Sequence, residues 1–256
     1  MSTRAERKAR KRKVVSRVLS GGAALSLLRR MGQKDLGTSQ KGTGQFCLIA
    51  PLGGRPVVCR DLEAASAKAH AAGQLLLADL ADSPGACPAI RLGADASMEP
   101  LGDGRVLLRV AVDVLRGEGQ GAALLRGVLA VGEEPDAQTE GLLAKQNQEW
   151  RQASDAAQVV ASYLRCHPRV DEVRYPGLRG DPSFDLAART LEGGFGTRVS
   201  FRLVGTDAPV RAAAECGADA PGEMDAPSAI PWQDLACTAG DPMAQVLFLE
   251  EKLAKF

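Results

Sequence analysis

Short apolar runs separated by glycine, proline and polar residues dominate the first half of the chain. Runs at residues 46–50 and 75–79 are bounded by such residues, which is the pattern of fully buried β-strands. A third strand is predicted at residues 106–114, where valine and leucine predominate. These segments are too short to be complete helices, so we expect them to form a sheet.

A helix is predicted between the first two strands. Residues 61–72 are rich in alanine, Asp61 stands where an N-cap residue belongs, and Gly73 stands where a helix C-terminal glycine belongs. Strand, helix and strand joined by short links indicate a parallel α/β sheet.

The second half of the chain has a different pattern of predicted elements. A long helix is predicted over residues 136–166, followed by a connection rich in proline and glycine. An alternating strand follows at 197–203, a loop at 217–231 and a closing amphipathic helix at 241–256. The change predicts a domain boundary within the long helix, near residues 155–165.

The predicted organisation is therefore a basic, helix-prone tail at residues 1–19, a domain over 20–155 and a smaller domain over 156–256. The net charge of the chain is only +1, so the part after the tail is slightly acidic. The tail is either a solvated terminus or a patch for nucleic acid or another anionic surface. Its basic residues are Arg4, Arg7, Lys8, Arg10, Lys11, Arg12, Lys13 and Arg17.

Composition places the chain among soluble globular proteins, with 256 residues of which 45% are hydrophobic. No apolar run is long enough to span a bilayer, and Arg17 interrupts any signal-peptide core, so we expect a cytoplasmic protein. The cysteines form no C-x-x-C pair, which argues against a zinc site or a disulfide framework. They are Cys47, Cys59, Cys87, Cys166, Cys216 and Cys237.

Two segments of the second half carry a specific pattern. Residues 160–178 contain a helix ending in His-Pro and then V-x-x-V-x-Y-P-G-L, and residues 193–201 read G-G-F-G-T-R-V-S-F. In this order the motifs resemble those of the Cys/Met-metabolism enzymes that depend on pyridoxal phosphate (PLP), the cystathionine gamma-synthase group.

The resemblance extends upstream. Residues 69–79 match the family's A-H-A-A-G helix and following strand, residues 92–95 match its L-G-A-D, and residues 20–32 are similar to its Y-G-G-T-Y helix. The family's N-terminal arm and first strands have no counterpart. The resemblance therefore implies a truncated aminotransferase-like α/β large domain of fold type I, with a smaller C-terminal α+β domain.

PLP chemistry needs a carboxylate at the pyridine nitrogen and a lysine that forms a Schiff base with the cofactor. The resemblance places Asp79, at the end of its strand, at the pyridine nitrogen, so Asp79 is the one candidate cofactor-binding residue. An aspartate that ends a strand can equally cap the next turn.

The family's lysine has no counterpart. Counting back from residues 125–132, which are similar to the signature that follows the lysine, gives Arg116, whereas counting forward from the L-G-A-D motif gives Asp103. No lysine occurs between Lys68 and Lys145. Arginine cannot replace it, because a guanidinium stays protonated and offers no free amine. We therefore assign no catalytic residue.

Other positions of the family's site are also substituted. The resemblance aligns the ring-stacking tyrosine with Ser20, an asparagine with Gly54, and a phosphate-binding serine with Asp113 on the backward count. The arginine that clamps the substrate carboxylate aligns with Ala236, and bidentate recognition is lost with it.

The functional prediction is thus a degenerate homologue of the trans-sulfuration enzymes, catalytically inactive, that acts through association with itself or with a full-length homologue. The alternative is a residual PLP-dependent transferase or lyase of sulfur amino-acid metabolism. PLP is the cofactor implied by the resemblance.

Two other features have rival interpretations. Residues 117–122 fit G-x-G-x-x-A with Asp136 some twenty residues on, the shape of a dinucleotide fingerprint, but a loop is the simpler interpretation. His70 and His167 have no partners at metal-ligand spacing, so both are interpreted as structural.

Overall fold

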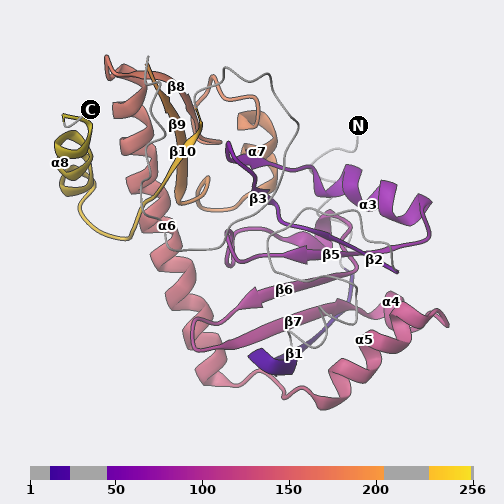
Figure 1. Cartoon of the computed structure of the whole chain (residues 1–256). Coiled ribbons are helices and arrows are strands. Elements are labelled where there is room, and N and C mark those ends of the chain that lie inside the picture. The colour runs from indigo at the N-terminus through magenta and orange to yellow at the C-terminus, as the bar shows by residue number, and fades with distance from the viewer. Residues whose placement is uncertain (1–11, 24–44, 205–230, 255–256) are drawn as a thin grey trace. The chain divides into compact units, whose positions relative to one another are not determined.

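The computed structural model describes residues 12–23, 45–204 and 231–254. The chain divides into two compact units. The first unit contains residues 1–51 and 61–147, and the second contains residues 52–60 and 148–256. Helix α6 (Ala137–Cys166) contributes residues to both, and each unit is described by itself (Figure 1).

A five-stranded mixed sheet forms the centre of the first unit, in the order β1-β7-β6-β5-β2. β2, β5 and β6 are parallel to one another, whereas β7 is antiparallel to β6 and β1 is antiparallel to β7. β7 reverses direction because only a short turn, residues 101–104, joins it to β6. The strands are β1 (Val14–Ser20), β2 (Phe46–Ile49), β5 (Leu75–Asp79), β6 (Ala96–Pro100) and β7 (Arg105–Ala111).

Helices and apolar side chains complete this unit. α3 (Leu62–Ala71) precedes β5, and α5 (Gln120–Val131) packs its buried Leu125 into the core cluster of the sheet. Burial of each such leucine contributes about 1.5–3 kcal/mol. Two short helices, η1 (Ala89–Leu92) and α4 (Val112–Leu115), lie next to the sheet ends.

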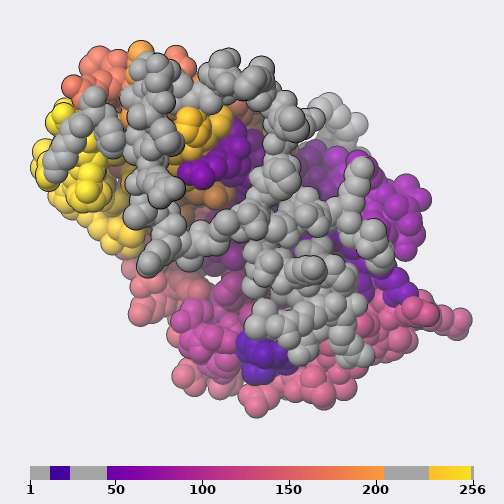
Figure 2. Space-filling model, in the orientation of Figure 1, coloured from indigo at the N-terminus to yellow at the C-terminus, as the bar shows by residue number. Residues whose placement is uncertain are grey.

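The second unit is built on a three-stranded antiparallel sheet, ordered β10-β9-β8. Its core combines α6, α8 and this sheet around the fully buried Tyr175. Its elements are β3 (Leu52–Gly53), β4 (Val58–Cys59), β8 (Val170–Arg174), α7 (Phe184–Thr190), β9 (Arg198–Leu203), β10 (Gln233–Ala236) and α8 (Pro242–Leu253). Figure 2 shows atoms of α8, in yellow, at the molecular surface.

Several predictions are confirmed. The strands at 46–50 and 75–79 correspond to β2 and β5, and α3 begins directly after Asp61, whose Oδ1 accepts a 3.0 Å hydrogen bond from the Ala64 amide. The long helix, the alternating strand and the closing helix correspond to α6, β9 and α8. The strand predicted at 106–114 is β7, but it ends at Ala111, and α4 follows.

The prediction of a helix-prone tail was wrong for its last residues. Val14–Ser20 form β1, which pairs along its whole length with β7 and buries Val18 and Leu19. The pairing partner lies some ninety positions away in the sequence, so local helix propensity could not reveal it. Residues 1–11 lie outside the described part of the chain.

Some predictions concern residues that are not described. The loop at 217–231 lies outside the described residues except for its last position, and most of the motif at 20–32 lies outside them as well. In the described part of the chain, the two units divide within α6 after Asn147, a little before the boundary expected from the sequence. No helix among the described residues is long and apolar enough to cross a membrane.

Candidate functional site

Asp79 lies at the carboxyl end of β5 and is 4% exposed. Its Oδ1 accepts a 3.0 Å hydrogen bond from the Ala81 amide, and no described residue offers it a cationic partner. Burial raises the pKa of the Asp79 carboxyl; the Ala81 hydrogen bond opposes this shift, and the nearby charge of Asp82 adds to it. The carboxylate is therefore suited to accept a hydrogen bond from a cationic N–H group.

The neighbouring strand carries a second buried carboxylate. Glu99 of β6 is 1% exposed, forms an ion pair with Arg109 of β7, and accepts a 2.5 Å hydrogen bond from the Gly85 amide. The loop after β5 is thereby fixed to β6. In this loop the buried Ser83 hydroxyl has no hydrogen-bond partner, which is uncommon for a buried polar atom.

The two positions proposed for the lysine lie at opposite ends of β5 and β6, which we call the carboxyl edge and the amino edge of the sheet. β5 and β6 are parallel, with Asp79 opposite Met98, so the turn that contains Asp103 follows β6 at the same edge as Asp79. β7 is antiparallel to β6, so it ends at the amino edge. There the Ala111 amide donates a hydrogen bond to the Asp95 carbonyl. Arg116 follows shortly after that point.

The Asp95 amide donates to the Leu76 carbonyl, so Asp95 lies beside Leu76. Leu76 precedes Asp79 by three residues on β5, which is about 10 Å at about 3.3 Å per residue. The geometry therefore favours the forward count from the L-G-A-D motif. Residues 125–132, on which the backward count depends, lie in α5 and at its C-cap.

Asp103 is itself engaged in an ion pair. Arg105 donates to it from the main-chain amide (3.0 Å) and from Nε (2.8 Å). The Arg105 side chain holds the pKa of the Asp103 carboxyl below its ordinary value, chiefly through this side-chain hydrogen bond. At this edge, the described turn presents a carboxylate and a guanidinium, and it has no free amine.

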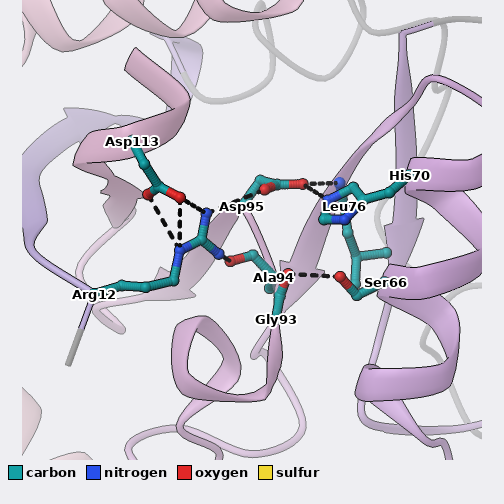
Figure 3. Close-up of polar contacts among 8 residues, drawn as sticks. All are labelled: Arg12, Ser66, His70, Leu76, Gly93, Ala94, Asp95 and Asp113. Carbon is teal, nitrogen blue, oxygen red and sulfur yellow. Dashed lines mark hydrogen bonds and ion pairs between the residues drawn. The ribbon is translucent and has the colours of Figure 1, made fainter. Parts of the chain in front are cut away.

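The opposite edge of the sheet holds a connected polar network (Figure 3). Oδ2 of the buried Asp95 lies 2.7 Å from Nε2 of His70 and accepts a 2.8 Å hydrogen bond from the Leu76 amide. Ser66 donates to the Gly93 carbonyl at 2.7 Å. The network thus joins the A-H-A-A-G and L-G-A-D motifs, which are 25 positions apart at His70 and Asp95.

Arg12 extends this network to the start of β1. Its Nη1 donates to the Ala94 carbonyl at 2.9 Å, its Nη2 lies 3.4 Å from Asp95 Oδ1, and its Nε and Nη2 contact the Asp113 carboxylate at 2.7–3.1 Å. The Asp113 pKa is lowered, chiefly by the hydrogen bond from Arg12. Sequence reasoning placed Arg12 in the tail and Asp113 at a phosphate, because the contacts of Arg12 are all more than 80 positions away.

The remaining substituted positions are distributed over both units. Ser20 ends β1 in the first unit, and its hydroxyl accepts a hydrogen bond from the Ala23 amide. Gly54 lies in the second unit between β3 and β4, where a φ of +88° favours glycine. Ala236 ends β10 in the same unit and pairs with Arg198 of β9.

Comparison with known proteins decides the family. The family model described as Cys/Met metabolism PLP-dependent enzyme matches residues 53–216, more than half of the chain. The chain belongs to this family.

Curated members of the family match over a short segment. O-succinylhomoserine sulfhydrylase of Mycobacterium tuberculosis is 50% identical over 48 residues, which is 19% of this chain and 12% of that protein. Cystathionine gamma-synthase of Mycobacterium bovis is 46% identical over 50 residues, which is 20% of this chain and 13% of that protein. The aligned segment thus spans about an eighth of these relatives.

Solved structures of the family share the fold. Cystathionine gamma synthase from Xanthomonas oryzae pv. oryzae superposes with a TM-score of 0.64 at 19% identity, covering 93% of this chain and 81% of that chain. A methionine gamma lyase from Micromonospora echinospora superposes with a TM-score of 0.61 at 19% identity, covering 91% and 79%. The predicted fold type I class is confirmed.

The described residues fit PLP at one point. Asp79 has the burial and the place at the carboxyl edge to hold a protonated pyridine nitrogen, which is what makes the ring of PLP an electron acceptor. The turn after β6 does not fit the covalent attachment, because Asp103 stands there. We therefore derive no catalytic step through the cofactor.

The residues considered for dinucleotide or metal binding make contacts that support the fold. Asp136 caps α6, since its Oδ1 accepts from the Thr139 amide and hydroxyl at 2.8 and 2.7 Å. The glycines at 117–122 follow α4 instead of a strand. His167 lies 3.2 Å from Glu250, and no group of three metal-ligating side chains occurs among the residues with described positions.

Proposed function

We propose that this member of the family does not attach PLP covalently, does not catalyse trans-sulfuration, and acts through association with another protein chain. The observation that carries the proposal is the pairing of Asp103 with Arg105 at the edge of the sheet that also carries Asp79. A second support is the lysine-free sequence from Ala69 to Ala144.

The chemical argument rests on the amine. Covalent attachment of PLP requires an unprotonated lysine amine that can attack the cofactor aldehyde. A carboxylate is not a nitrogen nucleophile, and a guanidinium keeps its proton. Asp79 can still contact the ring without a covalent bond, so reversible PLP binding is compatible with the proposal.

The proposal is tested by borohydride reduction of the full-length protein after incubation with PLP and removal of the excess. We expect no pyridoxyl-lysine in a tryptic peptide map and no absorbance band from a lysine-bound cofactor. Stoichiometric labelling of one lysine, at any position, would refute the proposal.

Two variants that substitute lysine test which position corresponds to the family's lysine. If Asp103 occupies the lysine's place, Asp103→Lys should gain labelling at residue 103, since that turn lies at the edge of Asp79. Arg116→Lys is the matched control, because residue 116 follows β7 at the other edge. Labelling of the second variant alone would reverse the assignment.

The alternative is residual transferase or lyase activity of the kind named for the relatives. Its support is the buried Asp79 carboxylate, which has the pKa shift and position of a cofactor contact. Release of succinate from O-succinylhomoserine in the presence of PLP and a thiol distinguishes the two. Turnover that is abolished in Asp79→Asn would establish the alternative.

A further inference from the structure

The turn between α6 and β8 holds helix α8 through two contacts. His167 Nε2 lies 3.2 Å from the Glu250 carboxylate of α8, and the Arg169 guanidinium donates to the Leu253 carbonyl at the end of that helix. The turn is closed by a 3.0 Å hydrogen bond from the Val170 amide to the His167 carbonyl. A change at His167 therefore reaches both contacts.

The hydrogen bonds of His167 define where its proton lies. The Arg169 amide donates to Nδ1 at 3.2 Å, so Nδ1 acts as an acceptor and carries no hydrogen. In the neutral ring the hydrogen is then on Nε2, which donates it to Glu250. The His167 side chain is only 10% exposed, and in its neutral form both ring nitrogens are hydrogen-bonded.

A second proton on His167 would have two opposite effects. It would form at Nδ1, where it would face the N–H of Arg169, so a largely buried hydrogen bond would be replaced by two opposed donors. The ring would also gain a positive charge beside Glu250. That carboxylate side chain is 54% exposed, and an ion pair at such a site contributes little. The lost hydrogen bond is the larger effect, so the turn favours neutral His167.

Groups from each element packed against His167 keep their charge near neutral pH. Tyr163 of α6 has its ring centre 5.7 Å from that of the imidazole and donates its hydroxyl to Glu250. Desolvation and this hydrogen bond raise the pKa of Tyr163 to about 12, so Tyr163 stays neutral. Arg169 directs its charge to the Leu253 carbonyl. Glu250 supplies the negative charge at the ring, and it is shared with Tyr163.

We infer that residues 167–170 form a pH-sensitive latch for α8: neutral His167 holds the helix on the core of the second unit, and protonation of His167 loosens it. Detachment of α8 would expose its inner residues Val246, Leu249 and Leu253. Histidine changes its charge between about pH 5 and 8, so the latch acts in that range. The inference goes beyond the proposed function and does not depend on it.

The test is hydrogen exchange of the full chain at pH 7.5 and 5.5, followed by mass spectrometry and corrected for the intrinsic pH dependence of amide exchange. We expect the protection of α8 to fall at least about tenfold at pH 5.5, which is the order of effect of one lost buried hydrogen bond. The protection of α5, in the first unit, should stay constant.

Two variants separate His167 from other groups. His167→Asn keeps an acceptor for the Arg169 amide and cannot be protonated, so its α8 protection should not depend on pH. His70→Asn is the matched control, because the chain has two histidines and His70 lies in the first unit, where it contacts Asp95. This control should keep the wild-type change in α8. Far-UV circular dichroism at pH 7.5 shows whether each variant is folded.

A third variant tests the balance of the two effects. Glu250→Gln removes the charge that favours protonated His167 and keeps an acceptor for the Tyr163 hydroxyl. The fall in α8 protection between pH 7.5 and 5.5 should therefore be steeper in this variant than in the wild type.

Three results would overturn the inference. Protection of α8 that is equal or higher at pH 5.5 would mean that the ion pair with Glu250 outweighs the lost hydrogen bond. A fall that persists in His167→Asn would assign the pH dependence to another group. If His167→Asn does not fold, Glu250→Gln decides, because a shallower fall in that variant contradicts the latch.

Discussion

Replacing Arg12 by alanine should destabilise the first unit, because its side chain is only 20% exposed and joins separate segments. The Arg12 guanidinium contacts three groups from two segments: the Asp113 carboxylate of α4, and the Ala94 carbonyl and Asp95 carboxylate of the loop before β6 (Figure 3). Removing it leaves the fully buried Ala94 carbonyl without its charged donor.

The magnitude follows from these contacts. A buried acceptor that loses its partner costs about 1–3 kcal/mol. The contact with Asp113, whose side chain is 63% exposed, contributes at most about 1 kcal/mol. The 3.4 Å contact with Asp95 is long, and Asp95 keeps its bonds to His70 and Leu76. We therefore expect Arg12→Ala to lower the free energy of unfolding by about 2–3 kcal/mol.

Urea denaturation followed by far-UV circular dichroism at pH 7 measures the loss. Hydrogen exchange of the β1 amides gives the local effect, since Arg12 directly precedes the strand that pairs with β7. Arg17→Ala is the matched control: Arg17 lies in β1 and pairs with Glu134, whose side chain is 82% exposed, so its loss should cost less than about 1 kcal/mol.

The effect should also depend on pH. Because the Asp113 pKa is lowered in the folded state, its contact with Arg12 contributes stability that is fully present above 3.8 and lost as the pH falls through the lower folded value. Arg12→Ala should therefore lose less stability than the wild type in this acidic range. An Arg12→Ala protein as stable as Arg17→Ala at pH 7, with unchanged exchange in β1, would refute the reasoning.

Three further predictions concern other positions. Asp79→Asn should raise the free energy of unfolding at pH 7, because burial raises the Asp79 pKa in the folded state; the gain should shrink as the pH falls toward 4, as thermal melts at both pH values would show. Gly93→Ala should cost about 2 kcal/mol, since φ is +99° and the new Cβ would lie 3.0 Å from Ser66 Oγ, whereas Gly104→Ala, with a φ of +83° and open space, should cost about 1 kcal/mol in the same urea titration. Tyr175→Phe should cost about 1–2 kcal/mol, because its hydroxyl lies 3.0 and 3.1 Å from two main-chain carbonyls in the core; unfolding followed by tryptophan fluorescence tests this, and an unchanged midpoint would contradict it.

Elements whose signals are local could be predicted from the sequence. α3 has its N-cap Asp61, its alanine-rich body and Gly73 within a dozen residues, and the structure has the helix there. β2 and β5 are continuous apolar runs, as buried parallel strands require. The prediction of a parallel sheet was wrong for β7 and β1, which are antiparallel to their neighbours, because the direction of β7 depends on the length of one turn, 101–104.

The site could be predicted only in part. Asp79 was identified at the end of a strand, and the structure places it there. The choice between Asp103 and Arg116 could not be made by counting, since residues 125–132 resemble a signature but form a helix. Arg12 gave no local signal, because charge patterning in a basic segment is the same whether an arginine is solvated or binds two carboxylates.

The polar network at the amino edge of the first unit is separate from the carboxyl edge that carries Asp79 and Asp103. Asp95 contacts both His70 and Arg12 at the amino edge of β5 and β6, and neither contact involves a residue of the carboxyl edge. At that other edge, Asp79 destabilises the folded state at neutral pH, because a buried carboxylate with a raised pKa favours protonation. If the proposed function holds, Asp79 contacts PLP without a covalent bond, and added PLP should therefore bind weakly and reversibly.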